Sequence, residues 1–146
     1  MKRLENKVAI VTGAARGMGK AEAELFAQEG AKVVLADILE KEVAEVANQI
    51  NKKGGEAIAF KLDVSKAKDW EKVIDEVVKK WGKVDVLVNN AGILSLSGIE
   101  DISEEEWDKV MEINAKSDFL GIKYVLPAMK MAKKGSIVNI SSIYGL

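Results

Sequence analysis

The sequence predicts an α/β protein with a doubly wound parallel sheet that carries helices on both of its faces. Short apolar runs typical of buried strands alternate with longer segments whose apolar residues recur at helical spacing. The alternation continues through five strands and four helices, which is typical of βαβ units in a parallel sheet. Since no internal repeat, linker or low-complexity tract interrupts it, we interpret residues 1–146 as one domain.

The composition argues against several classes of function. The 22 Lys and Arg residues are balanced by 23 Asp and Glu residues, so no basic excess is available for binding nucleic acid. The sequence has no Cys and no His, which removes thiol chemistry, the usual zinc sites and acid–base catalysis by histidine. No apolar run reaches the roughly 18 residues that span a membrane, and no signal peptide is evident. We therefore expect a cytoplasmic protein that binds neither membrane nor metal.

The glycine-rich turn after the first strand is the first candidate binding site. An apolar run at residues 8–11 precedes the turn, and helix-compatible residues follow at 20–29. The free N–H groups and the dipole of a helix start suit a phosphate. Gly13 permits a sharp exit from the strand, Gly17 lets a phosphate approach, and Gly19 lets helix and strand pack closely. The spacing G-x-x-x-G-x-G differs from the common G-x-G-x-x-G fingerprint, so a plain loop is the alternative.

The second predicted strand, residues 32–37, ends in an acid that suggests which cofactor binds. Asp37 follows Gly19 by 18 residues, close to the spacing at which an acid meets the adenine ribose. A carboxylate there accepts both ribose hydroxyls of NAD and repels a 2′-phosphate by about 4 kcal/mol at 4 Å and an effective dielectric near 20. We therefore expect NAD. The alternative is that Asp37 only caps the next helix.

Two amphipathic helices are predicted next, on either side of a strand at residues 57–62. The first spans residues 39–53, and its apolar face consists of Val43, Val46, Ala47 and Ile50. Ser65 is expected to cap the second. The apolar face of that helix consists of Trp70, Val73, Ile74, Val77, Val78 and Trp81. We expect both tryptophans to lie in the core.

The fourth predicted strand, residues 84–88, leads into Asn89-Asn90-Ala91-Gly92. Amides and a glycine at the end of a strand suit the ligand crevice of a parallel sheet, although they also suit an ordinary turn. Ser103 and Glu106 then form a capping box that begins a long helix. The apolar stripe of this helix is Trp107, Val110 and Met111, followed by Asn114. A buried Asn without partners costs about 1–3 kcal/mol, so Asn114 is either a satisfied bridge or part of a site.

The final predicted elements are the rest of this helix and a fifth strand. The small residues Ser117 and Gly121 permit close helix contact, and Pro127 is expected to kink or shorten the helix near its end. The strand is predicted at residues 136–142 and ends in Ser142.

Together these motifs resemble the short-chain dehydrogenase/reductase family, single-domain type, over its N-terminal portion. Thr12-Gly13-x-x-x-Gly17-x-Gly19 is similar to the family's cofactor turn, and Asn89-Asn90-Ala91-Gly92 is similar to its fourth-strand motif. Asp63 matches the adenine contact, Asn114 the proton-relay asparagine and Ser142 the catalytic serine. The resemblance implies a Rossmann-like fold and hydride transfer between NAD(P) and an alcohol or carbonyl substrate.

The resemblance also implies which residues act. The cofactor would be held by Gly13, Arg16, Gly17, Met18, Gly19, Asp37, Asp63, Val64, Asn90, Ala91 and Gly92. Ser142 would hold the substrate oxygen, and Asn114 would bind a water of the proton relay. A basic residue at Arg16 can meet a 2′-phosphate in family members, which keeps NADP as the less favoured cofactor. Ser95, Leu96 and Ser97 would line the substrate pocket, with a plain surface loop as the equal alternative.

The sequence departs from the family pattern at its C-terminal end. The family's Tyr-x-x-x-Lys begins about thirteen residues after the serine, whereas this sequence ends at Leu146, and Tyr144 has no lysine after it. We expect the N-terminal part of an oxidoreductase that lacks the last strands of the fold. The alternative is an inactive NAD-binding or self-assembling module. In the second case the fifth strand is an open edge, which favours association. We expect a homo-oligomer.

Overall fold

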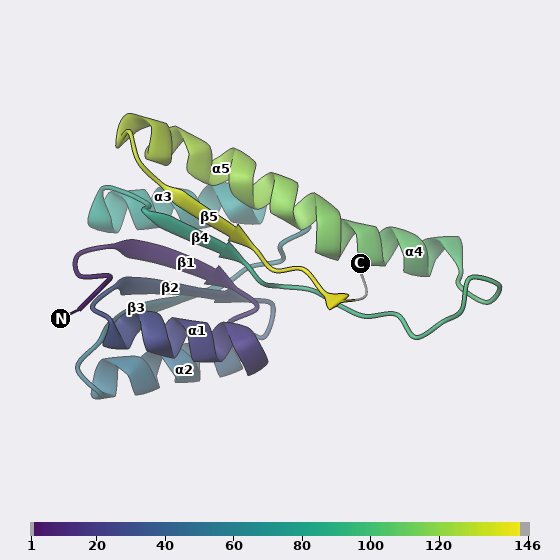
Figure 1. Cartoon of the computed structure of the whole chain (residues 1–146), viewed down its shortest axis with the longest axis horizontal. Coiled ribbons are helices and arrows are strands. Elements are labelled where there is room, and N and C mark those ends of the chain that lie inside the picture. The colour runs from purple at the N-terminus through teal and green to yellow at the C-terminus, as the bar shows by residue number, and fades with distance from the viewer. Residues whose placement is uncertain (1, 144–146) are drawn as a thin grey trace.

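The computed structural model describes residues 2–143 and contains one five-stranded parallel sheet (Figure 1). The strands are β1 (Val8–Thr12), β2 (Lys32–Asp37), β3 (Glu56–Lys61), β4 (Val86–Asn89) and β5 (Ser136–Asn139). The helices are α1 (Gly17–Gln28), α2 (Glu40–Lys52), α3 (Ala67–Trp81), α4 (Glu104–Met111) and α5 (Ser117–Met131), with a π-helical segment, η1 (Glu112–Lys116), between the last two. None of the helices in the described part of the chain is long and apolar enough to cross a membrane.

The strand order is β3-β2-β1-β4-β5, so the sheet is doubly wound as predicted. The chain builds outward from β1 to β3 and then returns to place β4 on the other side of β1. Val11 therefore pairs with Leu35 of β2 on one side and with Val88 of β4 on the other. The carboxyl ends of β1 and β4 meet where the winding direction reverses, which is the usual ligand crevice of open α/β sheets.

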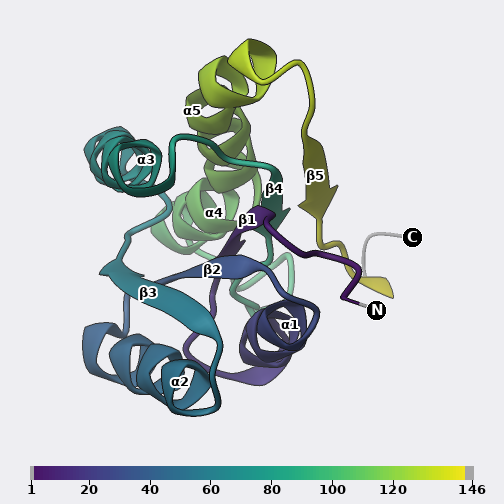
Figure 2. The same cartoon turned by 90° about the vertical axis from the view of Figure 1, so that its left-hand side faces the viewer.

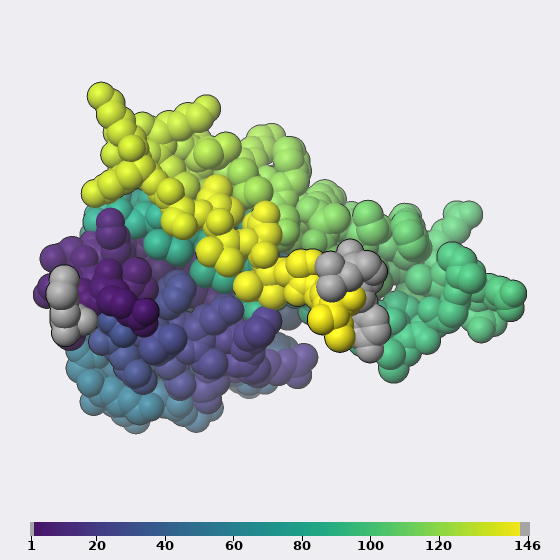
Figure 3. All heavy atoms as spheres, in the orientation of Figure 1, coloured from purple at the N-terminus to yellow at the C-terminus, as the bar shows by residue number. Residues whose placement is uncertain are grey.

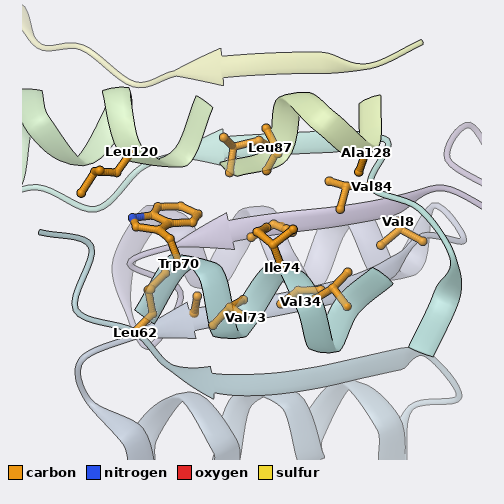
Figure 4. Close-up of a cluster of buried hydrophobic side chains, with 14 of the residues drawn as sticks. Val8, Val34, Leu62, Trp70, Val73, Ile74, Val84, Leu87, Leu120 and Ala128 are labelled. Carbon is orange, nitrogen blue, oxygen red and sulfur yellow. The ribbon is translucent and has the colours of Figure 1, made fainter. Parts of the chain in front are cut away.

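Helices cover both faces of the sheet (Figure 2). Alternate side chains of a strand point to opposite faces, so Ile10 packs with α3 and α5 while Val11 packs with α1 and α2. Trp70, Ile74 and Leu120 fill the first core against Leu87 of the sheet (Figure 4). The predicted face of α2 is buried in the second core.

The two predicted tryptophans of α3 have different surroundings. Trp70 is fully buried, as predicted, and its indole N–H donates to the carbonyl of Val64. Trp81 is only partly buried, and its indole N–H donates to Glu56 of the edge strand β3. Its ring lies under the ammonium group of Lys32. The helix therefore carries one tryptophan in the core and one at the rim.

The predicted cap of α3 by Ser65 is wrong. The helix begins at Ala67, its N-cap is Lys66, and no side chain caps it. Ser65 is buried and donates its backbone N–H and its hydroxyl to the carboxylate of Asp63. The Ser65 hydroxyl is used in this local turn and therefore does not cap the N–H groups at the start of the helix.

The predicted buried stripe at the start of the fourth helix is also wrong. Trp107 is 51% exposed, Met111 is 43% exposed, and no residue of α4 is buried. In Figure 1 this helix extends past the carboxyl ends of the strands, so the sheet does not cover it. Half of the predicted capping box is confirmed, because Ser103 Oγ accepts a hydrogen bond from the N–H of Glu106. The Glu106 carboxylate accepts from Ser95 and Ser97 instead.

The long predicted helix is interrupted by η1 rather than by its proline. Pro127 lies inside α5, which continues to Met131. Gly121 allows the close approach predicted for it, since a Cβ there would lie 2.6 Å from Asn89 Oδ1 and 2.9 Å from the Trp70 ring. Strand β5 ends at Asn139, earlier than predicted, and lies at the edge of the sheet.

Candidate functional site

A cavity of about 340 Å³ opens at the carboxyl ends of the strands. Its lining residues are Gly13, Arg16, Asp37, Ile38, Leu39, Leu62, Asp63, Val64, Asn90, Ala91, Gly92, Ile93 and Ile113. All the predicted cofactor residues except Gly17, Met18 and Gly19 are among them. The segments that follow β1, β2, β3 and β4 thus converge on one site, as the doubly wound topology requires.

The start of α1 lies beside this cavity, and no side chain there caps its N–H groups or offsets its positive dipole. The N-cap residue Arg16 makes no side-chain capping bond, and the first turn holds no acidic residue. By contrast, α4 is capped by Ser103 and carries Glu104, Glu105 and Glu106 in its first turn. The free N–H groups and the positive end of the α1 dipole are therefore available to an anion such as a phosphate.

The three glycines of the turn are required for different structural reasons. Gly13 (φ 66°) and Gly17 (φ 57°) adopt left-handed backbone angles that favour glycine. A Cβ on Gly19 would collide with the carbonyl of Gly13 and with the Asn90 side chain. A Cβ on Gly17 would meet no protein atom within 4 Å, so space for a ligand remains in front of this residue.

Thr12 and Asn90 tie the glycine turn to the end of β4. The Thr12 hydroxyl accepts hydrogen bonds from the N–H groups of Asn90 and Ala91, both at 3.0 Å, and donates to Val88 O. The Asn90 amide donates to Thr12 O at 2.9 Å. Asn90 therefore lines the cavity while its side-chain N–H shapes the turn.

Asp37 lines the cavity and bonds the backbone on both sides of it, although the N-cap of α2 is Leu39 rather than Asp37. Its carboxylate accepts from Leu39 N, the N-cap residue of α2, and from Ala15 N in the glycine turn, both at 3.0 Å. It also lines the cavity together with Arg16. Each carboxylate oxygen can accept a further hydrogen bond, so these contacts leave capacity for a ribose hydroxyl.

Asp63 and Val64 are held against the start of α3. The Asp63 carboxylate accepts from the backbone and hydroxyl of Ser65, and Asp63 N donates to Asp69 Oδ2 at 3.0 Å. The carbonyl of Val64 accepts from the buried Trp70 at 2.9 Å. These bonds fix the segment whose residues form the cavity wall after β3.

Asn114 is exposed rather than buried, because η1 lies on the part of the helix that the sheet does not cover. Its amide makes a pair of 2.8 Å hydrogen bonds with Ile93, accepting from the N–H and donating to the carbonyl. Asn114 is thus a satisfied bridge, and its neighbour Ile113 lines the cavity. Single π-helical turns within helices frequently occur at functional sites.

Ser142 is not among the cavity-lining residues. It lies three residues beyond the end of β5 and is exposed. Because the strands are parallel, it lies at the same edge of the sheet as the cavity. Tyr144 lies outside the described residues.

The sequence reasoning missed the apolar walls of the cavity and the role of Glu106. The apolar wall residues are Ile38, Leu39, Leu62, Ile93 and Ile113. Four of them come within a few residues of a strand end, which is the signal that could have identified them. The hydroxyls of Ser95 and Ser97, predicted near the substrate, both donate to Glu106.

Comparison with known proteins gives a consistent result. The short chain dehydrogenase family model matches residues 7–146. A cyclopentanol dehydrogenase of Comamonas sp. strain NCIMB 9872 is 45% identical over all of this chain, which covers 58% of that protein. A 3-alpha-(or 20-beta)-hydroxysteroid dehydrogenase of Mycobacterium tuberculosis is 45% identical over 99% of this chain and 54% of its own length.

Solved structures agree with these sequence relatives. A short-chain dehydrogenase/reductase from Burkholderia xenovorans superimposes with a TM-score of 0.95 at 37% identity, over 99% of this chain and 60% of that one. A metagenomic short-chain oxidoreductase in complex with NADP gives a TM-score of 0.91 at 38% identity, over 96% of this chain and 64% of that one. The chain therefore spans little more than half the length of the curated relatives it matches. With its glycine turn, its doubly wound sheet and these relatives, the chain belongs to the short-chain dehydrogenase family.

Proposed function

We propose that this chain binds NAD and forms the cofactor half of an oxidoreductase that transfers hydride between the nicotinamide and an alcohol or carbonyl compound. The observation that carries the proposal is the uncapped, acid-free start of α1 beside a cavity lined by Asp37 and Arg16. A bound nicotinamide would supply the hydride acceptor or donor. Every other contribution described below belongs to residues of this chain.

Different residues along the cavity bind different parts of the dinucleotide. The N–H groups from Gly17 to Gly19 hold the pyrophosphate, and Asp37 accepts the ribose hydroxyls. Asp63 and Val64 border the adenine, while Asn90, Ala91 and Gly92 border the nicotinamide end. The hydrogen bonds of Thr12 and Asn90 support this division, because they fix the turn before any ligand arrives.

At the substrate end, we assign Ser142 to the substrate oxygen and Asn114 to the proton relay. The sequence contains no Tyr-x-x-x-Lys, so these 146 residues supply only part of the acid–base machinery that the family uses. The relative named for cyclopentanol supports an alcohol on a carbon ring as the substrate. The alternative of an inactive module gains no support from the curated relatives, whose names describe dehydrogenases.

The preference for NAD is tested by titrating NADH and NADPH against the protein and following nicotinamide fluorescence. We expect the Kd for NADH to be lower, because the Asp37 carboxylate repels a 2′-phosphate in this cavity. Asp37→Ala should reduce the ratio of the Kd for NADPH to the Kd for NADH at least tenfold, which corresponds to about 1.4 kcal/mol. Asp75→Ala removes an exposed carboxylate of α3 and serves as the control. A lower Kd for NADPH in the unmodified protein would contradict the preference.

A further inference from the structure

The chain between β4 and α4 has no regular structure of its own (Figure 1). Side chains from one helix nevertheless hold it in place. Asn114 fixes the backbone of Ile93 through two hydrogen bonds. Glu106 bonds the hydroxyls of Ser95 and Ser97. The segment from Ile93 to Ser97 is thus attached at both ends to the continuous helix formed by α4 and η1.

Packing does not explain how this segment keeps its place. Leu94 is 67% exposed and Leu96 is 91% exposed, so neither large side chain is held by burial. A loop whose apolar side chains stay in water gains little from the hydrophobic effect. The hydrogen bonds to Glu106 and Asn114 are therefore the main contacts that order it.

Glu106 uses both carboxylate oxygens for this purpose. Ser95 Oγ donates to Oε1 at 2.6 Å, and Ser97 Oγ lies 3.2 Å from Oε1 and 3.0 Å from Oε2. The N–H of Ser97 in turn donates to Ser95 Oγ at 3.1 Å. The hydroxyls of Ser95 and Ser97 hold the pKa of Glu106 below its ordinary value, so the acceptor is an anion at neutral pH. Hydrogen bonds to an ionised acceptor are stronger than those between neutral groups.

The bonds at Glu106 bear on the cavity through Ile93. Ile93 lines the cavity directly after Gly92, and the Ser95–Ser97 anchor begins two residues further on. Glu106 and Asn114 are eight residues apart, about 12 Å along a helix. Two anchors at that separation fix the direction of the segment as well as its position.

We propose that Glu106 is a positioning residue, which holds Ser95 and Ser97 against the start of α4 and so keeps the Ile93 wall of the cavity in place. The ordering of the segment stands on its own contacts, whereas the effect on cofactor rests on the proposed function. A competing explanation is that Glu106 only stabilises the helix start by its charge. Glu105 has the same charge in the same turn and provides the matched control.

Amide hydrogen exchange tests the positioning role without any ligand. In Glu106→Ala we expect the N–H of Ser97 to exchange about tenfold faster, because its acceptor loses its own anchor. Glu106→Gln keeps an acceptor oxygen and should restore most of the protection. Glu105→Ala should leave the rate unchanged. Equal rates in Glu106→Ala and Glu105→Ala, or no restoration by Gln, would overturn the proposal.

NADH titration of the same variants tests the link to the cavity. We expect Glu106→Ala to raise the Kd about threefold, and Glu105→Ala to leave it unchanged. Faster exchange with an unchanged Kd would overturn the link. If the unmodified protein itself fails to bind NADH, the proposed function fails, and the exchange rates still decide whether Glu106 orders the segment.

Discussion

At the scale of single residues, Gly17 is the position where backbone geometry and the proposed cofactor meet. Its φ of 57° would strain the backbone of any residue with a side chain. No protein atom lies within 4 Å of the position that a Cβ would take. We expect Gly17→Val to weaken NADH binding at least tenfold, because the new side chain occupies the space of the phosphate and distorts the turn. Fluorescence titration with NADH measures this change.

Gly54 offers a matched control for that substitution. It also has a positive φ of 84° and no protein atom within 4 Å of a built Cβ, but it lies after the end of α2, away from the cavity. Gly54→Val should lower stability by about 1–3 kcal/mol while the Kd for NADH stays unchanged. Equal loss of binding in both variants would show that Gly17 acts only through folding.

Individual residues also show how far sequence reasoning reaches. The spacing of motifs identified Asp37, and the structure shows that this carboxylate both lines the cavity and bonds the start of α2. The burial predicted for Asn114 was wrong, because an apolar stripe indicates a face but not whether anything covers that face. The partners of Glu106 could not be predicted from the sequence, since they depend on the path of an irregular segment.

At the scale of elements, β1 and β4 are joined at their amino ends by Asp85. This buried carboxylate accepts from Val8 N at 2.9 Å and lies 2.7 Å from the ammonium group of Lys83. Burial raises the pKa of Asp85, but the hydrogen bonds from Lys83 and Val8 N–H and the charges of Lys83 and Lys7 outweigh this effect and leave the pKa below its ordinary value. The carboxylate form is therefore the one that stabilises the sheet.

We expect Asp85→Asn to lower the free energy of unfolding by about 2 kcal/mol at pH 7. A folded-state pKa below the unfolded value means that the stabilisation is complete above about pH 4 and is lost as the pH falls through the folded pKa. The difference between the two proteins should therefore shrink below pH 4. Urea unfolding between pH 2 and pH 7 measures it.

The control for this experiment is Asp75→Asn, on the exposed face of α3. It removes one carboxylate without touching the contact between β1 and β4, so its effect should stay within about 0.5 kcal/mol. A constant difference between the unmodified protein and Asp85→Asn down to pH 2 would contradict the role assigned to the carboxylate.

Elements with a covered apolar face were the ones that the sequence predicted well. The four-residue face of α2 follows from helical periodicity, and the buried strands β1 and β2 follow from their unbroken apolar runs. The π-helical turn at η1 was missed because one extra residue in a helical turn leaves no periodic signal in so short a stretch. The end of β5 was placed too late, since apolar alternation continued beyond its pairing with β4.

At the scale of the whole molecule, large apolar side chains remain in solvent along α4 and α5. Trp107, Met111 and Phe119 are exposed on these helices. The edge strand β5 lies across the surface in Figure 3, with Val138 exposed as well. Exposed apolar surface and an open strand edge both favour association.

We expect the isolated chain to self-associate at micromolar concentrations, with a weight-average mass above 15.9 kDa in sedimentation velocity. The double variant Trp107→Ser and Phe119→Ser should shift the distribution toward monomer. Leu25→Ser removes an exposed apolar side chain from α1 and should leave it unchanged. A clean monomer of the unmodified chain at high concentration would contradict this expectation.

The contact between β1 and β4 joins residues that are 77 and 78 positions apart in the chain, at Val8 with Asp85 and at Thr12 with Asn90. Both the glycine turn and the wall after β4 take their positions from this pairing, so an unfolded chain has no partial version of the site. A dinucleotide bound as proposed would therefore bind the folded state alone. At a concentration one hundred times its Kd it would add about 2.7 kcal/mol to the free energy of unfolding. The melting temperature of this protein would then rise with the concentration of the cofactor.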